Sequence, residues 1–231
     1  MDARIRAVFF DVDFTLIFPG PNFQGEGYQR TCAAFGVQAD AARFDEAVAA
    51  SSFILDEVEE PIYDDDLYIH YTASIIEHMG GRGPGVIKAA REIYSQWAVN
   101  HHFEMYDDVA PTLQQLQARG LIVGVISNSH RSLDAFRDHF ELGGLIHALV
   151  SSSLHGYMKP HPSIFETALL RAGVAASESM MVGDSLKADV EGALAAGMKA
   201  VLLRRSGEVP TDLPQGVHVI QSLTELDALL R

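Results

Sequence analysis

The sequence predicts an α/β fold, in which a parallel sheet is flanked by helices and an all-helical segment is inserted near the start of the chain. Three observations support this prediction. A short apolar run at residues 4–10 ends at acidic residues, residues 24–98 have helical periodicity, and strand and helix patterns alternate from residue 103 onward. Since the first run matches the strands of the alternating part, we assign it to the same sheet and interpret the helical stretch as an insertion.

The elements of the alternating part follow one another closely. Residues 121–126 form a continuous apolar run, which is typical of a buried parallel strand. The helix before it is marked by Pro111 near its start and Gly120 after its end. We expect strands at residues 4–10, 121–126, 145–150, 180–182, 200–203 and 217–220, and helices at 110–119, before 140, and at 162–172, 187–196 and 223–230.

The insertion begins where the run Pro-Gly-Pro-Asn at residues 19–22 breaks regular structure. Apolar residues then recur at helical spacing, and Pro61 and the glycine-rich residues 80–85 divide the stretch into helical hairpins. The predicted domains are an α/β core of residues 1–18 and 103–231 and a helical insertion of residues 19–102.

The composition limits the classes of partner. The chain has 231 residues, 48% of them hydrophobic, and a formal charge of −14, which argues against nonspecific binding to nucleic acid or an anionic membrane. Cys32 is the only cysteine, so an intrachain disulfide and a cysteine metal cluster are excluded. No uninterrupted run of apolar residues reaches the length of a membrane span. We expect a soluble, cytoplasmic protein.

Two acids follow the first predicted strand. Asp11 and Asp13 are separated by one residue, so in an extended chain their side chains start out on the same face. Carboxylates this close repel each other unless a cation or a shared proton joins them. Mg²⁺ is one natural solution, because it prefers oxygen ligands and is commonly held by one or two carboxylates.

Polar side chains follow other predicted strands of the same sheet. They are Ser127 and Asn128, Lys159, Asp184 within a Gly-Asp-Ser run, and Asp189. Taken singly, each has an ordinary structural interpretation as a helix cap, a turn or a solvated loop cation. Taken together, they fall at the carboxyl ends of the strands, where open α/β sheets bind their ligands.

With these residues in place, the chain resembles the haloacid dehalogenase-like hydrolase superfamily, in particular its phosphatase-type members with a helical cap inserted after the first motif. The four motifs of the resemblance are DVDFTL at residues 11–16, ISN at 126–128, KP at 159–160 and GDSLKAD at 183–189. The resemblance covers essentially the whole chain and implies a Rossmann-like core, with residues 19–102 as the cap.

The resemblance implies a role for each catalytic position. Asp11 would be the nucleophile that forms an aspartyl-phosphate, and Asp13 the general acid and then the general base. Ser127 and the backbone amides near Asn128 would bind the phosphoryl oxygens. Lys159 would neutralise the phosphate and Asp11 together.

The resemblance also implies a Mg²⁺ site. Its ligands would be the Asp11 carboxylate, the backbone carbonyl of Asp13 and the Asp184 carboxylate, with Asp189 bound directly or through water. Phosphoryl transfer requires mainly this kind of positioning and charge compensation.

Phe14 departs from the family pattern, which most often has glycine there. One hypothesis is that Phe14 narrows the mouth of the site and limits substrate size. The other is that it fills a gap between core and insertion. Asp13, by contrast, agrees with the phosphatase members and argues against the dehalogenase branch, which typically lacks this second acid.

We therefore expect a Mg²⁺-dependent phosphatase that hydrolyses small phosphorylated metabolites and acts as a monomer or a homodimer. Two alternatives stay open. One is a phosphomutase of the same superfamily, which returns the phosphoryl group to an intermediate. The other is a catalytically silent binding or regulatory protein that keeps the fold.

Overall fold

The computed structural model describes residues 4–56, 58, 60–207 and 209–230. The chain forms two compact units. The first, here called the α/β unit, comprises the chain up to Phe18 and from Met105 onward. The second, the helical unit, is Pro19–Glu104.

The α/β unit contains a six-stranded sheet in the order β5-β4-β1-β6-β7-β8. Every strand pair is parallel, and β1 lies between β4 and β6. The strands are β1 (Ala7–Phe10), β4 (Ile122–Ser127), β5 (Ala148–Ser151), β6 (Ser179–Gly183), β7 (Lys199–Leu203) and β8 (His218–Ile220). The predicted α/β class and parallel sheet are confirmed.

The centre of the sheet is fully buried, and its packing is set by side-chain size. Phe9 on β1 pairs in register with Gly124 on β4. A Cβ atom at residue 124 would lie 2.5 Å from a ring carbon of Phe9, so the phenyl ring occupies the space that a larger residue would need. On this face Phe9 belongs to an apolar cluster that includes Phe165 and Val190.

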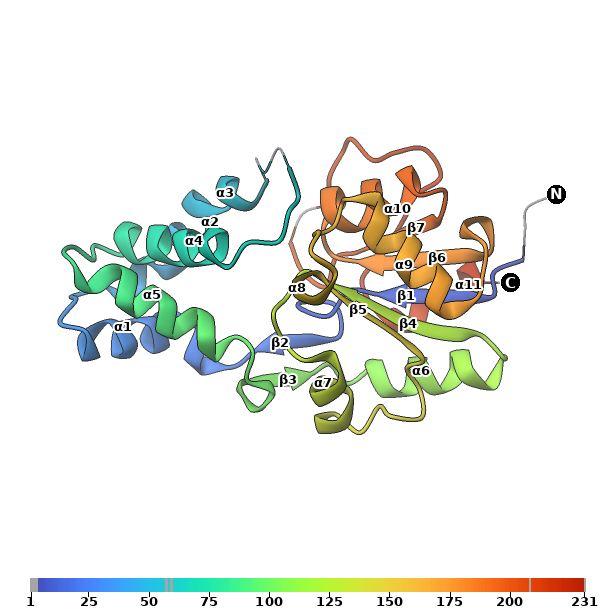
Figure 1. Cartoon of the computed structure of the whole chain (residues 1–231), viewed down its shortest axis with the longest axis horizontal. Helices are drawn as coiled ribbons and strands as arrows, with labels where there is room; N and C mark the ends of the chain where they lie inside the picture. The colour runs from blue at the N-terminus through green and yellow to red at the C-terminus, as the bar shows by residue number, and fades with distance from the viewer. Residues whose placement is uncertain (1–3, 57, 59, 208, 231) are drawn as a thin grey trace. The chain divides into compact units, whose positions relative to one another are not determined.

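Helices cover both faces of the sheet (Figure 1): α9 and α10 lie on one side and α6 on the other. The helices of the α/β unit are α6 (Val109–Ala118), α7 (Leu133–His139), α8 (Ser152–His155), α9 (Pro162–Ala172), α10 (Gly192–Ala195) and α11 (Leu226–Leu229), with short 3₁₀ turns η4 (Ala176–Glu178) and η6 (Leu223–Glu225). Helix α9 has the predicted bounds, with Pro162 in its first turn and Gly173 in the left-handed conformation after its end.

Three predicted helices differ from the observed ones, and one of them, expected at 223–230, is divided into the 3₁₀ turn η6 and the short helix α11. The segment after β4 does not become helical until Leu133, because the Ser132 hydroxyl caps the helix by accepting a hydrogen bond from the amide of Ala135. The predicted helix at residues 187–196 is divided into a π-helical segment, η5 (Leu186–Glu191), and the short helix α10. Hydrophobic periodicity does not distinguish these two helical forms.

The helical unit contains α1 (Gly25–Ala34), α2 (Phe44–Ser51), α3 (Phe53–Asp56), α4 (Asp65–His78) and α5 (Gly85–Gln96), with 3₁₀ turns η1 (Pro21–Phe23), η2 (Ala41–Arg43) and η3 (Asn100–His102). Its core includes Ile75 and Ile76 of α4 and Ile93 of α5. Among the described residues, no helix of either unit is both long enough and apolar enough to cross a membrane.

A second, two-stranded sheet pairs β2 (Ile17–Pro19) with β3 (Phe103–Met105). The sequence did not predict either strand, because each is short and β2 ends at Pro19, in the run that we interpret as breaking regular structure. Beside them, the amide of Gly20 donates a 2.8 Å hydrogen bond to the carbonyl of His102, so the two ends of the helical segment are directly joined. The unit boundary falls at 104/105, two residues beyond the expected 102/103.

Candidate active site

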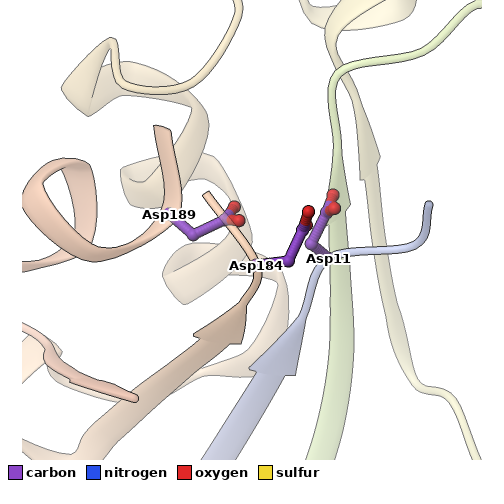
Figure 2. A group of neighbouring side chains, drawn as sticks. All are labelled: Asp11, Asp184 and Asp189. Carbon is purple, nitrogen blue, oxygen red and sulfur yellow. The ribbon is translucent and has the colours of Figure 1, made fainter. Parts of the chain in front are cut away.

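Two acids lie at the carboxyl ends of neighbouring central strands. Asp11 follows β1 directly, and its amide donates a 3.0 Å hydrogen bond to the carbonyl of Val182 on β6. Asp184 follows β6. Figure 2 shows Asp11 and Asp184 beside each other at the strand ends, with the carboxylate of Asp189 nearby. One carboxylate oxygen of each acid lies within 4.8 Å of the others.

Asp189 reaches this cluster from the π-helical segment η5. Its side chain is 1% exposed, and its Oδ2 accepts a 3.0 Å hydrogen bond from the amide of Ser185. A Cβ atom at Gly183 would lie 2.2 Å from the same Oδ2. Because no L side chain tolerates such a contact, the glycine before Asp184 is what leaves room for Asp189.

Lys159 provides the positive charge of the cluster. Its buried Nζ donates hydrogen bonds of 2.6 Å to Oδ1 of Asp11, 2.6 Å to Oδ1 of Asp189 and 2.8 Å to the carbonyl of Ile126. Asn128 holds the lysine backbone: its Oδ1 accepts from the amide of Lys159 at 2.7 Å, and its Nδ2 donates to the carbonyl at 2.9 Å. The side chain of Asn128 therefore positions Lys159.

Ser127 ends β4 next to this cluster and is 1% exposed. Within the described part of the chain, its hydroxyl oxygen has no hydrogen-bond partner. A buried hydroxyl normally finds a partner, because an unsatisfied one costs about 1–3 kcal/mol. Among the described residues, Thr112 and Ser152 also have such hydroxyls. Ser127, however, directly follows Ile126, whose carbonyl accepts a hydrogen bond from Lys159, so Ser127 lies near the acidic cluster.

The cluster contains three buried or partly buried carboxyl groups and one ammonium group, so negative charge is in excess. Burial raises the pKa of Asp11 well above its ordinary value; Lys159 opposes this effect, while Asp189 and Asp184 add to it. Burial and then the charge of Asp189 raise the pKa of Asp184 to about 7. Burial lowers the pKa of Lys159, but the charges of Asp11 and Asp189 outweigh it, so the ammonium form is strongly favoured.

Asp13 is not part of the three-acid cluster. Its Oδ1 accepts a 2.9 Å hydrogen bond from Nη1 of Arg131, whose side chain is completely buried. The sequence prediction missed Arg131. The available signal was its place three residues after Asn128, in the loop at the end of β4, where a cation is close to the site edge.

Phe14 lies in the turn after Asp13 and has a φ of +62°. This left-handed conformation costs a residue with a Cβ atom about 1–2 kcal/mol, which explains physically why glycine suits the position. The side chain is 45% exposed. The two hypotheses about Phe14 and substrate size or gap filling stay predictions.

A second charged network surrounds the loops that carry these acids. Arg205 donates to the carbonyl of Thr15 at 2.8 Å and pairs with both carboxylate oxygens of Asp108 at 2.9 and 3.0 Å. Its guanidinium lies 3.7 Å from the centre of the Tyr106 ring. Arg204 donates a hydrogen bond to the backbone carbonyl of Asp184. These arginines fix the backbone of both acid-bearing loops.

The donor set suits a divalent cation. Asp11, Asp184 and Asp189 offer carboxylate oxygens only, which are the ligands that Mg²⁺ prefers. Lys159 supplies the one ammonium group among these four side chains, so the acids exceed it in charge. The residues present therefore fit Mg²⁺, together with a phosphate group bound beside Ser127 and Lys159.

Comparison with known proteins decides the family. The model of the haloacid dehalogenase-like hydrolases matches residues 5–197. The chain belongs to this family. It is 30% identical to haloacid dehalogenase-like hydrolase domain-containing protein 3 of Danio rerio, over 100% of this chain and 98% of that protein. The superfamily predicted from the sequence motifs is confirmed.

Other relatives of this haloacid dehalogenase-like hydrolase include named phosphatases. It is 29% identical to the N-acylneuraminate-9-phosphatase of Mus musculus, over 99% of this chain and 95% of that enzyme. A magnesium-bound hydrolase of the superfamily from Bacillus subtilis has the same fold, with a TM-score of 0.75, 18% identity and 99% of each chain covered.

Proposed function

We propose that this chain is a Mg²⁺-dependent phosphatase that hydrolyses small phosphorylated metabolites through an aspartyl-phosphate. The observation that carries the proposal is the position of Lys159, whose ammonium group bridges Asp11 and Asp189 beside an unpartnered buried Ser127 hydroxyl. Phosphoryl transfer requires this combination of an oxygen nucleophile and fixed positive charge. The named phosphatases among the relatives support the same reaction class.

Asp11 is proposed as the nucleophile. Its carboxylate oxygen would attack phosphorus, and the ester bond to the leaving oxygen would break, which divides one displacement into two easier ones. Lys159 opposes the burial-driven rise in the pKa of Asp11 and holds its carboxylate in place through a 2.6 Å hydrogen bond. The same ammonium group would offset charge on the phosphoryl oxygens.

Asp13 is proposed as the proton carrier. It would donate a proton to the leaving oxygen in the first step and accept one from the attacking water in the second. Its position supports this assignment, because Asp13 lies two residues after Asp11 and its side chain is 16% exposed and held by Arg131.

The phosphoryl oxygens are proposed to bind at the end of β4. The Ser127 hydroxyl would donate one hydrogen bond, and backbone amides near Asn128 would donate others. Asn128 contributes indirectly, since its side chain fixes the backbone of Lys159. Phe14, in the same turn as Asp13, is proposed to border the substrate.

Mg²⁺ is proposed to bind the carboxylates of Asp11 and Asp184 and the backbone carbonyl of Asp13, with Asp189 bound directly or through water. When bound, the ion would offset the negative charge of the transferring phosphoryl group. The buried, mutually repelling acids support this proposal, because their raised pKa values reflect charge that a cation would neutralise.

The helical unit is proposed to act as a cap. Cap closure would exclude water during the first transfer and select the substrate. We further propose that the substrate is a small phosphorylated metabolite, that the enzyme acts as a monomer or homodimer, and that it works in the cytoplasm, where its single thiol, Cys32, stays reduced.

A phosphate-release assay tests the proposal. The wild-type protein should release phosphate from p-nitrophenyl phosphate and from members of a metabolite panel when Mg²⁺ is present, and not after chelation. Asp11→Asn should abolish release, whereas Asp134→Asn, which alters an exposed acid of the same unit, should leave it unchanged. Absence of turnover on every substrate with Mg²⁺ would refute the proposal. If a labelled phosphoryl group from a bisphosphate were returned to the sugar or metabolite instead of being released as phosphate, the protein would be a mutase.

A further inference from the structure

The contact between Arg131 and Asp13 is unusual because it joins a fully buried cation to a partly exposed acid. The Arg131 side chain is 0% exposed and that of Asp13 is 16% exposed. A guanidinium removed from water costs several kcal/mol unless charged and polar partners compensate. Burial of the Arg131 guanidinium is therefore unfavourable by itself, and Asp13 is a charged partner that compensates it.

The local backbone holds Arg131 in this place. The amide of Arg131 donates a 2.9 Å hydrogen bond to the hydroxyl of Ser129, which is itself buried. The loop then enters α7 through the capping hydroxyl of Ser132. The arginine is thus fixed at both ends of its short loop, and its planar head presents a defined donor direction to Asp13.

The geometry of the pair leaves one oxygen of Asp13 available. Nη1 of Arg131 donates to Oδ1 of Asp13 at 2.9 Å. Across the described residues, no other side chain forms a recorded hydrogen bond with this carboxylate. A carboxylate held through Oδ1 in this way can still exchange a proton at Oδ2.

We propose that Arg131 is the positioning residue for proton transfer: it holds Asp13 through Oδ1 so that Oδ2 faces the reacting oxygen in both steps. This inference rests on the proposed function, in which Asp13 is the proton carrier. In the first step, the Asp11–phosphorus bond forms, the ester bond breaks and Asp13 gives its proton to the leaving oxygen. In the second, water bonds to phosphorus, the Asp11–phosphorus bond breaks and the water proton passes to Asp13.

Loss of the Arg131 side chain should change the dependence of kcat/KM on the leaving group in the same way as loss of the Asp13 carboxylate. A good leaving group such as p-nitrophenolate departs without a proton, whereas phenolate is a poorer leaving group that benefits from one. In Arg131→Gln, kcat/KM for phenyl phosphate should fall by about 10- to 100-fold, while kcat/KM for p-nitrophenyl phosphate should change little.

The second step should also slow in this variant. With p-nitrophenyl phosphate, Arg131→Gln should show a burst of one p-nitrophenolate per enzyme followed by a slower steady rate, because the aspartyl-phosphate accumulates when water lacks an oriented base. Arg131→Lys, which keeps the charge, should recover part of the loss on phenyl phosphate. Inhibition by inorganic phosphate reports whether each variant keeps a folded phosphate site.

A double-mutant cycle completes the test. In an Asp13→Asn background, Arg131→Gln should cause no further loss, since the residue that it positions is already gone. The matched control is Arg137→Gln, which breaks a 2.9 Å pair with Asp134 in α7 and should leave both substrates unaffected.

Two results would overturn the inference. One is an equal fall in kcat/KM for both aryl phosphates without a burst, and the other is a full multiplicative effect of Arg131→Gln in the Asp13→Asn background. Wild-type turnover together with either result refutes the role of Arg131 alone. Absence of wild-type turnover on both aryl phosphates and on the metabolite panel refutes the proposed function, and the Arg131 assignment with it.

Discussion

Two charged networks at the carboxyl edge of the sheet show how the same residue types serve different purposes. In the first, Lys159 faces Asp11 and Asp189, with Asp184 nearby. In the second, Arg205 faces Asp108. The first network has more acids than cations and its cation, Lys159, is 2% exposed, whereas the second is a balanced pair whose cation, Arg205, is 15% exposed.

The pKa values of the acids show the consequence of this difference. Burial raises the pKa of Asp11 and Asp184. Burial also acts on Asp108, but hydrogen bonds from Arg205 and Ser222 and from the amide of Leu223 outweigh it and lower its pKa. The Asp108 network is complete in itself, while the Asp11 network needs an external cation or a ligand to balance its charge.

The largest expected effect follows from removal of the central cation. Lys159→Met should lower the free energy of unfolding by about 3–5 kcal/mol at neutral pH, because two buried carboxylates lose their partner. Arg205→Met should cost less, since Asp108 keeps its bonds from Ser222 and Leu223. Urea unfolding of both variants measures this, and an equal or smaller loss for Lys159→Met would contradict the comparison.

Added Mg²⁺ should stabilise the folded protein through the acids of the first network and not through Asp108. At a concentration about 100 times its Kd, Mg²⁺ should add about 2.7 kcal/mol to the free energy of unfolding of the wild-type protein. Asp184→Asn should reduce this gain strongly, whereas Asp108→Asn should keep it. Thermal or urea unfolding with and without Mg²⁺ measures the gain, and an unchanged gain in Asp184→Asn would place the ion elsewhere.

The balanced network should contribute stability that depends on pH. Asp108→Asn should lower the free energy of unfolding by about 1–3 kcal/mol at pH 7, with little effect on turnover. The pKa of Asp108 is lower in the folded state than its ordinary value of 3.8. The contribution of Asp108 to the free energy of unfolding is therefore fully present above pH 3.8, and it is lost as the pH falls through the folded-state pKa.

Unfolding of the wild type and of Asp108→Asn at several pH values measures this contribution. The difference between the two proteins should be constant from pH 7 to about pH 5 and should shrink below the ordinary aspartate pKa of about 3.9. If the difference in the free energy of unfolding instead grew as the pH fell, the pKa of Asp108 would be raised in the folded state and the prediction would be wrong.

The smallest effect concerns the turn between the networks. Phe14→Gly removes the strain of a left-handed phenylalanine, about 1–2 kcal/mol, but adds about 0.5–1 kcal/mol of unfolded-state entropy. The net result should be a stabilisation of at most about 1.5 kcal/mol. Phe14→Ala is the control, because alanine keeps the backbone strain; if both variants behave alike, strain is not what the glycine relieves.

The sequence predicted the α/β class and indicated Asp11 and Asp184, because each directly follows a strand that its apolar pattern marks. It also indicated Lys159 and Asp189, although α8 lies between β5 and Lys159 and η5 carries Asp189. Parallel strands deliver their carboxyl ends to one edge, which brings Asp11 and Asp184 together. The loop after α8 and the segment η5 then supply Lys159 and Asp189. The partner of Asp13 could not be predicted in this way. The spacing of Arg131 from Asn128 places it near the site, but it lies in an irregular loop, and no pattern signals that its side chain is buried against Asp13.

The arginines after β7 were missed for a related reason. Arg204 and Arg205 bind backbone carbonyls of Asp184 and Thr15, and such contacts leave no motif, because any carbonyl can accept. The strands β2 and β3 are too short for an alternating pattern, and the π-helical form of η5 depends on how its backbone packs.

The hydrogen bond between Gly20 and His102 has a consequence for how this chain can be rebuilt. Since the ends of the helical segment meet at 2.8 Å, the stretch between them is a loop with adjacent termini. Such a segment can be excised and closed with a tight turn, or exchanged for another of the same end spacing, without lengthening the path between β2 and β3. We therefore expect the α/β unit to accept other insertions whose two ends lie equally close together.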